Sequence, residues 1–197
     1  MKPTGKTFWD GTDYYSLPAI HDPSTGIYLA DSWAIAEYLE KQYPNTPSIF
    51  PNNSKGLQSA FTDGFFAGVA PALDLLIPAT YAYLTPKSQE YFRRTRELGL
   101  GAKVEDIAPK GEKAVEEWAK LKAHYDKVDA WFAKTDDKGP FMMGDTISWA
   151  DFVVAGWNGR IRRVMGPDSK EWKNIESWNA GRWSHLLVAL SSYADEA

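Results

Sequence analysis

The spacing of hydrophobic residues predicts a short β-hairpin near the start of the chain. Residues 1–15 are rich in Pro, Gly, Asp and Thr, a composition typical of a loop. Two short apolar runs follow, at 16–20 and at 27–30. Turn chemistry lies between them, with a proline early and a glycine last, in the segment His21-Asp22-Pro23-Ser24-Thr25-Gly26. We therefore expect two antiparallel strands joined by a loop.

After the second apolar run, the spacing of the apolar residues becomes that of a helix. Apolar residues over 33–43 fall on one face of a helix. Asp31 or Ser32 would cap this helix at its start, and Pro44 would end it. The next segment, 44–54, is rich in Pro, Asn and Ser, which predicts a linker between a domain at 1–43 and a second domain.

Everything after the linker has a helical pattern, which predicts an all-helical domain at 55–197. Its first segment, 55–84, contains Pro71 and Pro78, and each proline should kink or break the helix. The segment 110–134 has the clearest apolar stripe. Further helices are expected after Pro86 and near 148–165, 169–179 and 181–194, with a loop at 98–109.

The two predicted domains differ in their capacity to fold. A helical region of about 140 residues can bury its own core. Two strands and one helix do not normally make a stable sheet, because three or more strands with a covered face are needed. Either packing against the helices stabilises the hairpin, or strands that should precede it are missing from this sequence. We favour the second interpretation.

Composition narrows the possible functions. The net charge is −4 without any basic run, so nucleic acid is not expected as a partner. No run of about 18 apolar residues is found, so we expect no membrane span. The chain has no cysteine, which excludes disulfides, thiolate metal sites and a cysteine nucleophile within it. Three scattered histidines lack metal-ligand spacing, so no metal site is expected. No secretory signal is visible, and a cytoplasmic location is expected.

Two local features point to a binding site. Pro18 lies inside an apolar strand pattern, where its missing N–H weakens a sheet. Asp31 and Ser32 place a carboxylate and a hydroxyl where a helix begins, beside N–H groups suited to anions. Each feature alone has a purely structural interpretation, an edge-strand proline or an ordinary helix cap. Together they predict a cradle for a small, charged, peptide-like ligand.

A second motif is a folding device. Ser148 and Asp151 have the spacing of a capping box at the start of a helix, with Ile147 and Phe152 placed for a hydrophobic staple. Caps of this kind contribute about 1 kcal/mol to stability and carry no chemistry.

These features together resemble those of cytosolic glutathione transferases. The resemblance rests on the Leu17-Pro18-Ala19-Ile20 strand, the turn, Asp31-Ser32 at a helix start, the proline-rich linker, the helical half and the capping box. It is nearest to a fungal-type class related to the bacterial lignin β-etherases. It implies an incomplete thioredoxin-like N-terminal domain of the α+β class, followed by an all-helical C-terminal domain.

The resemblance implies roles for matching positions. Pro18 is similar to the family's cis-proline, which presents the backbone of Leu17 to the cysteinyl unit of glutathione. Asp31 and Ser32 are similar to the pair that holds the γ-glutamyl end, Asp31 at the ammonium and Ser32 at the carboxylate. Lys6 is a candidate contact for the glycyl carboxylate. A pocket for hydrophobic substrate would be lined by Phe65, Phe66, Trp149 and Trp157, although aromatic residues at helical spacing also suit a core.

The resemblance leaves the catalytic residue unknown. The family's thiol-activating Ser, Tyr or Cys follows the first strand of the thioredoxin-like domain, and no position of this sequence matches it. We therefore expect that the strand–helix–strand before the proline strand is missing. The implied activity is transfer of glutathione to hydrophobic electrophiles, or their cleavage with it, with aromatic ethers among the substrates. The alternative is a non-catalytic carrier, a ligandin, of hydrophobic aromatic ligands. A homodimer is expected by resemblance.

Overall fold

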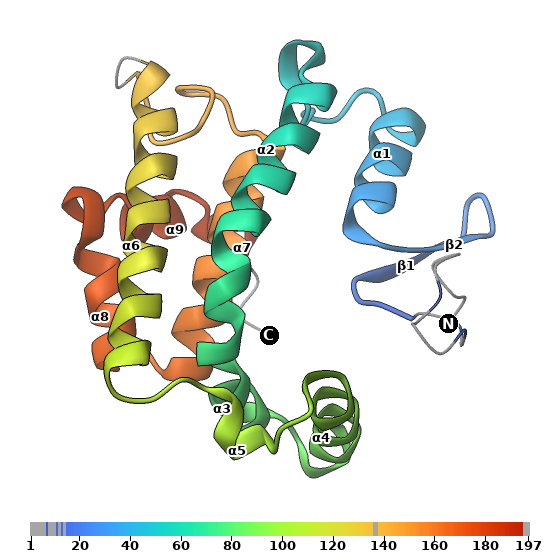
Figure 1. The fold of residues 1–197 in the computed structure, drawn as a ribbon. Coiled ribbons are helices and arrows are strands. Elements are labelled where there is room, and N and C mark those ends of the chain that lie inside the picture. Colours follow the sequence, from blue (N-terminus) through green and yellow to red (C-terminus); the bar gives the residue numbers. More distant parts are fainter. Residues whose placement is uncertain (1–6, 8–10, 12, 14, 136–137, 195–197) are drawn as a thin grey trace. The chain divides into compact units, whose positions relative to one another are not determined.

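The chain forms two compact units in a computed structural model, which describes residues 7, 11, 13, 15–135 and 138–194 (Figure 1). The first unit is Met1–Ile49 and the second is Phe50–Ala197. The division between the units falls inside the segment 44–54, where the sequence predicts a linker.

The first unit contains a hairpin and one helix. Strand β1 (Ala19–Asp22) pairs antiparallel with β2 (Ile27–Ala30), and helix α1 (Ser32–Gln42) follows. The hairpin confirms the expectation from the hydrophobic pattern, but the first strand begins at Ala19 and not at residue 16. Pro18 has no N–H to donate to a ladder, so pairing starts only after it.

The carboxylate of Asp22 joins this hairpin to α1. It accepts hydrogen bonds from the main-chain N–H of Ser24 at 2.8 Å and from its hydroxyl at 2.6 Å. It also accepts from the hydroxyls of Tyr38 at 2.6 Å and Tyr43 at 2.8 Å. These four bonds hold the pKa of Asp22 well below its usual value, the bond from the Ser24 hydroxyl having the largest effect. The Asp22 carboxylate, together with a 2.6 Å hydrogen bond between the hydroxyls of Thr25 and Tyr38, therefore links the hairpin to α1.

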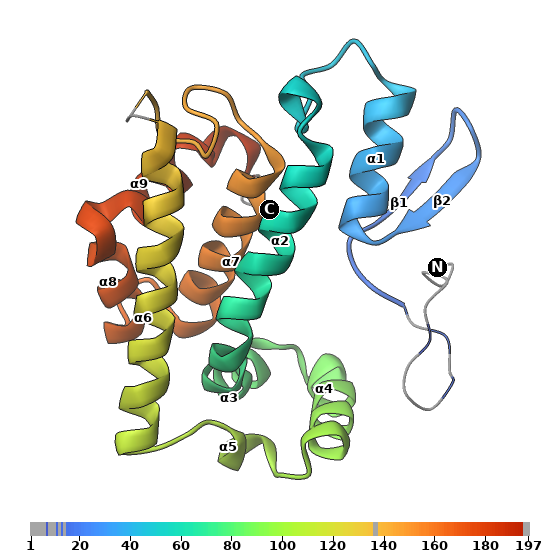
Figure 2. The same cartoon turned by 45° about the horizontal axis from the view of Figure 1, so that its top comes forward.

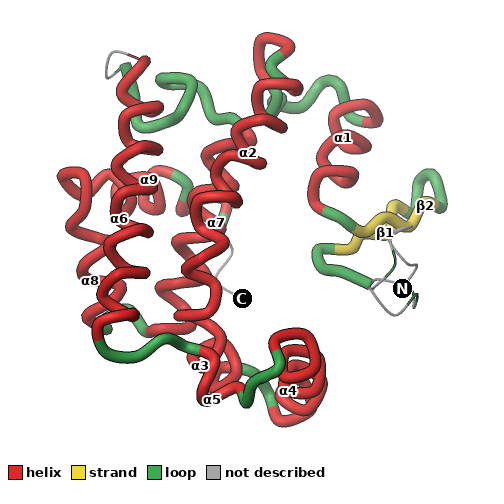
Figure 3. The backbone as a smooth tube through the Cα atoms, in the orientation of Figure 1, coloured by secondary structure: helices red, strands yellow, loops and turns green. Residues whose placement is uncertain are grey.

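In the described part of the second unit, the named elements are all helices, and loops and turns join them (Figure 3). Short 3-10 turns join several of its helices. The helices are α2 (Lys55–Val69), α3 (Leu73–Tyr83), α4 (Pro86–Leu100), α5 (Val104–Ile107), α6 (Glu112–Phe132), α7 (Trp149–Met165), α8 (Lys170–Ser177) and α9 (Arg182–Ala189).

The two prolines of the first helical segment behave differently. Pro71 lies in the 3-10 turn Ala70–Ala72 that separates α2 from α3, as the sequence predicts. Pro78 lies inside α3, so the helix does not break there, and the alternative expectation of a kink stays a prediction. The residues immediately before it, Leu75, Leu76 and Ile77, are buried, and their packing offsets the one hydrogen bond that the proline removes. The expected loop at 98–109 also contains the single turn of α5.

Helices α2, α6 and α7 lie side by side around one core (Figures 1 and 2). On α6 the predicted stripe is buried at Leu121, Tyr125, Val128 and Phe132, whereas Val115 near its start is exposed. Two tryptophans of the last helices, Trp172 and Trp183, complete this core together with residues of α2 and α7. The helical unit therefore buries its own core, as its length predicts.

The predicted capping box forms at the start of α7. The buried carboxylate of Asp151 accepts from the N–H of Ser148 at 2.7 Å and from its hydroxyl at 2.8 Å. Burial raises the pKa of Asp151, against the opposing effect of these hydrogen bonds. Asp151 therefore fixes the N-terminus of the helix that contacts most of the others in this unit.

One stretch qualifies as a membrane span by length and composition. Among the described residues it is Lys55–Tyr83, within the helical segment predicted at 55–84, although the sequence analysis expects no membrane span. The 3-10 turn at Ala70–Ala72 divides it, and Phe65, Val69 and Leu76 in it belong to the helical core. Core helices of this kind meet the same criterion.

Candidate glutathione site

The pairing register brings the two predicted binding segments to one end of the hairpin. Ala19 lies opposite Ala30 at the end of the ladder. Leu17 and Pro18 directly precede Ala19, and Asp31 and Ser32 directly follow Ala30. Because antiparallel strands run in opposite directions, the residues before one strand and after the other meet at the same end. The four residues therefore lie at the same end of the hairpin, although 14 positions separate Leu17 from Asp31.

Leu17 presents unpaired backbone at this end. The peptide bond between Leu17 and Pro18 is cis, as the resemblance implies. The residue is 78% exposed, and its N–H and C=O form no hydrogen bond to another described residue. Unpaired main-chain groups beside a strand end can pair with an extended peptide, which gains the bonds of an added strand.

Asp31 has an unusual backbone conformation. Its φ of 87° and ψ of 118° lie in a region that residues other than glycine rarely occupy. Its Oδ1 accepts from the N–H of Trp33 at 3.1 Å and of Ala34 at 3.3 Å, so the side chain caps α1. Such backbone strain costs about 1–3 kcal/mol and clusters at binding sites, where the surrounding structure maintains it.

Ser32 is the first residue of α1 and is exposed. Among the described residues, neither its N–H nor its hydroxyl has a hydrogen-bond partner. The following N–H groups are capped by Asp31, so Ser32 holds the open donor at the positive end of the helix dipole. An anionic group placed there would receive two hydrogen bonds and a favourable field.

The four residues predicted to line a substrate pocket belong to the helical unit. Lys6 falls outside the described residues. Phe65 is fully buried and belongs to the helical core, so its ring offers no surface to a ligand. Phe66 is 46% exposed and its ring lies 6.5 Å from that of the mostly buried Trp157. Trp149, the first residue of α7, donates from its indole N–H to the hydroxyl of Thr62 at 3.0 Å.

Sequence reasoning missed two polar residues that shape the units. Asp22 had a local signal, since Asp-Pro-Ser at a turn favours side-chain bonds to the backbone two residues on. Gln58 had none: its Oε1 accepts from the N–H of Ala150 at 2.8 Å, and its Nε2 donates to the sulfur of Met143 at 3.5 Å. It thereby satisfies one of the open donors in the first turn of α7 from a position 92 residues away. In the described part of the chain, no group of three or more metal-ligating side chains is found.

Comparison with known protein families shows to which family the chain belongs. The model for the C-terminal domain of glutathione S-transferases matches residues 56–193. The chain belongs to the glutathione transferase family. The chain is also 24% identical, over 173 residues, to the glutathione S-transferase-like protein gedE of Aspergillus terreus. It covers 66% of that curated relative, slightly under two thirds of its length.

Solved structures extend the similarity over nearly the whole chain. A glutathione S-transferase of Ceriporiopsis subvermispora in complex with glutathione is 40% identical, with a TM-score of 0.90, and the alignment covers 99% of this chain and 78% of that one. A second one from the same fungus, also in complex with glutathione, is 37% identical, with a TM-score of 0.86 over 97% of this chain and 77% of its own. A glutathione transferase from Phanerochaete chrysosporium is 33% identical, with a TM-score of 0.89, and the alignment covers 99% of this chain and 77% of that one. The fold is therefore that of this family, with a partial thioredoxin-like domain before a helical C-terminal domain.

Proposed function

We propose that this protein binds glutathione at the open end of its hairpin and transfers it to hydrophobic electrophiles. The observation that supports the proposal is the strained backbone of Asp31, at the hairpin end where Ala30 pairs with Ala19 and where Leu17 and Ser32 flank the two strands. Two similar structures were solved in complex with glutathione, and this supports the same ligand here.

Each part of the tripeptide has a matching group in the site. The cysteinyl unit pairs with the N–H and C=O of Leu17, in the manner of an added strand. The γ-glutamyl carboxylate accepts hydrogen bonds from Ser32, favoured by the helix dipole. The charge of Asp31 attracts the γ-glutamyl ammonium. Transfer itself requires the thiolate form of glutathione, which is the nucleophile.

Retention on a glutathione-agarose column tests the site. We expect the protein to be retained and to elute with free glutathione. Ser32→Ala should abolish retention because it removes the hydroxyl donor. Asp31→Asn is the informative partner variant: asparagine still caps helices and tolerates positive φ, but it carries no charge. Its retention should fall without loss of α1. If both variants elute with the wild type, the site assignment is wrong.

The proposed substrates are hydrophobic electrophiles, with aromatic ethers among them. The partly exposed ring of Phe66 beside Trp157 supports an apolar substrate. The same pair also suits a non-catalytic carrier of aromatic ligands, which is the second candidate function. Conjugation of a generic electrophile, measured beside binding of a fluorescent hydrophobic dye, separates them. Turnover supports the transferase, and dye binding without turnover supports the carrier.

A further inference from the structure

Helix α4 is attached to the helical unit differently from its neighbours. It lies at the edge of the unit, beside α3 and α5 (Figures 1 and 2). None of its 15 described residues is buried, whereas α2, α3, α6 and α7 each bury three or more. Tyr91 and Leu98 on it are 52% and 65% exposed. A surface helix is ordinarily held by an apolar stripe that it buries, so another kind of contact must hold α4.

A polar face of α4 supplies that contact. Gln89, Arg93 and Glu97 are spaced four residues apart and therefore lie on the same face of the helix. Gln89 Nε2 donates to the main-chain oxygen of Tyr81 on α3 at 3.0 Å. Glu97 Oε1 accepts from the main-chain N–H of Val104, the first residue of α5, at 3.1 Å. The face of α4 that meets its neighbours is thus polar, which reverses the usual arrangement of a surface helix.

Arg93 makes several further contacts. Its Nε donates to the hydroxyl of Tyr81 at 3.3 Å, and its guanidinium lies 4.5 Å from the centre of the same ring. Both of its terminal nitrogens donate to the carboxylate of Glu105 on α5. We call these contacts of Arg93 with Tyr81 and Glu105 the Arg93 clamp. The side chains of Arg93 and Glu105 are 34% and 57% exposed, and partly hydrated ion pairs contribute little to stability. The clamp therefore holds α4 only weakly.

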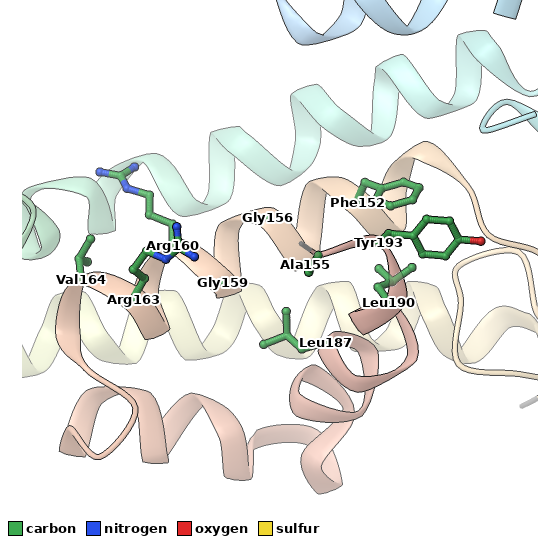
Figure 4. Close-up of a pocket in the computed structure, with 11 residues that line it drawn as sticks. Phe152, Ala155, Gly156, Gly159, Arg160, Arg163, Val164, Leu187, Leu190 and Tyr193 are labelled. Carbon is green, nitrogen blue, oxygen red and sulfur yellow. The ribbon is translucent and has the colours of Figure 1, made fainter. Parts of the chain in front are cut away.

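A like charge opposes the clamp. Arg160 lies in the second half of α7, where it also lines a groove between that helix and α9 (Figure 4). Its Nη2 donates to the hydroxyl of Thr80 on α3 at 3.4 Å. Burial, and then the charge of Arg96 on α4, lower the pKa of Arg160. Neither arginine pairs with a carboxylate among the described residues. The observed position of α4 thus brings two uncompensated cations toward each other.

The two ends of α4 can serve as hinges. Leu84 and Thr85 before it have an extended backbone, with a ψ of 154° each. Gly101 after it has a φ of 68°, in the left-handed region that favours glycine. A Cβ added to Gly99, in the last turn, would meet no atom within 4 Å, so packing does not require a glycine there. Hinges of moving elements are commonly a few residues of this kind at the ends of the element.

Contacts within α4 would keep it helical without its neighbours. Pro86 occupies its first turn, where the missing N–H costs no hydrogen bond. The guanidinium of Arg94 lies 5.7 Å from the ring of Tyr91, three residues earlier. That of Arg96 lies 4.8 Å from the ring of Phe92, four residues earlier. Side-chain pairs at these spacings stabilise isolated helices, so α4 can leave its neighbours without unfolding.

We propose that α4 is a flap, which opens away from α3 and α5 as an intact helix when the Arg93 clamp breaks. Opening uncovers Tyr81 and moves Arg96 away from Arg160, so relief of the repulsion offsets part of the lost clamp. Because these two effects oppose each other, the open state is a minor but populated one. Arg160 lies 5.6 Å from the ring of Trp157, so the flap borders the apolar surface proposed above for substrate. The movement itself does not depend on a ligand there.

Distances between two spin labels on the full chain test the proposal. The chain has no cysteine, so Glu90→Cys on α4 and Glu116→Cys on α6 place labels only at these two exposed positions. Double electron–electron resonance then resolves the closed and open populations. We expect one main distance in the labelled parent chain. Arg93→Gln should add a second distance, with a rise of about fivefold in the ratio of open to closed molecules.

Further variants separate the two opposing charges. Glu105→Gln removes the clamp from the side of α5 and should raise the open population as Arg93→Gln does. Adding Arg96→Gln to Arg93→Gln should lower it again, because the repulsion is gone. Arg94→Gln is the matched control, since its position is exposed and its ring contact with Tyr91 lies within the same helix. This control should leave the distances unchanged.

Four results would overturn the proposal. The first is an unchanged distance distribution in both Arg93→Gln and Glu105→Gln. The second is an equal shift in Arg94→Gln, which would make the change unrelated to the clamp. The third is a loss of helical circular dichroism in Arg93→Gln that corresponds to the 15 residues of α4, because the helix would then unfold and not open. The fourth is a further rise of the open population when Arg96→Gln is added.

Discussion

Asp151 Oδ1 accepts a hydrogen bond at 2.7 Å from the main-chain N–H of Met142, nine residues earlier in the chain. Its other oxygen accepts from Ser148. One buried carboxylate therefore joins the start of α7 to the loop before it. This is more than the capping box alone predicts, because that motif concerns only the helix end.

Removal of this carboxylate should destabilise the helical unit strongly. Asp151→Ala removes the acceptor from the N–H of the partly buried Met142 and from the N–H of the buried Ser148, and the free energy of unfolding should fall by about 3 kcal/mol. Asp151→Asn should also be costly, since either orientation of the amide turns its NH2 toward a donor. Ser148→Ala should cost only about 1 kcal/mol. Urea unfolding measures all three, and a cost for Asp151→Ala below about 0.5 kcal/mol would contradict this role.

Asp22 should control the first unit in the same way. Asp22→Ala removes the acceptor of four hydrogen bonds, so hydrogen exchange should accelerate at the amides of β1, β2 and α1 but not in the helical unit. Tyr38→Phe and Tyr43→Phe should each give part of this effect. Because the folded pKa is lowered, the stabilisation is present above the ordinary value of 3.8 and is lost as pH falls below it. Exchange rates that rise equally in both units would argue against this local role.

Gly68 on α2 should not accept a side chain. An added Cβ would overlap the imidazole ring of His124 on α6, so Gly68→Ala should destabilise the protein by about 1–3 kcal/mol. Gly64, one turn earlier, is the matched control. Its added Cβ would lie 3.7 Å from the ring of Trp131, an ordinary contact, and Gly64→Ala should be neutral or stabilising. Equal melting temperatures for the two variants would contradict this packing.

His124 should make stability depend on pH near neutrality. Burial, and then the charge of Lys127, lowers the pKa of His124 from its ordinary value of 6.5. The unfolded state therefore binds more protons, and the free energy of unfolding should fall as pH is lowered from about 7.5 to about 5.5. His124→Gln should flatten this slope. If the free energy of unfolding depends on pH equally in the variant and the wild type, another group is responsible for that dependence.

The sequence predicts order and type of elements better than their ends and long-range contacts. The hairpin, the helical half and the capping box all follow from local spacing, because each depends on residues within a few positions. Local spacing does not predict that β1 starts at Ala19, because strand pairing decides it. Nor does it predict that α3 continues through Pro78, because burial decides that. The bond between Gln58 and Ala150 spans 92 residues and leaves no local pattern.

The candidate glutathione site divides similarly. Pro18, Asp31 and Ser32 could be selected from the sequence. A proline is unusual inside a strand, and a polar pair is typical of the start of a helix. The positive φ of Asp31 could not be predicted, because an aspartate followed by a serine does not require it. The expected substrate pocket was the least predictable part. Phe65 and Phe66 are neighbours in the sequence, yet one is fully buried and the other is 46% exposed.

The most direct test of the central claim is an NMR titration of the labelled protein with glutathione and, separately, with cysteinylglycine, which lacks the γ-glutamyl unit. The account predicts shifts centred on the amides of Leu17 and Ser32, about tenfold tighter binding of glutathione, and loss of that preference in Ser32→Ala. Equal affinity for the two peptides, or glutathione shifts confined to other residues, would contradict it.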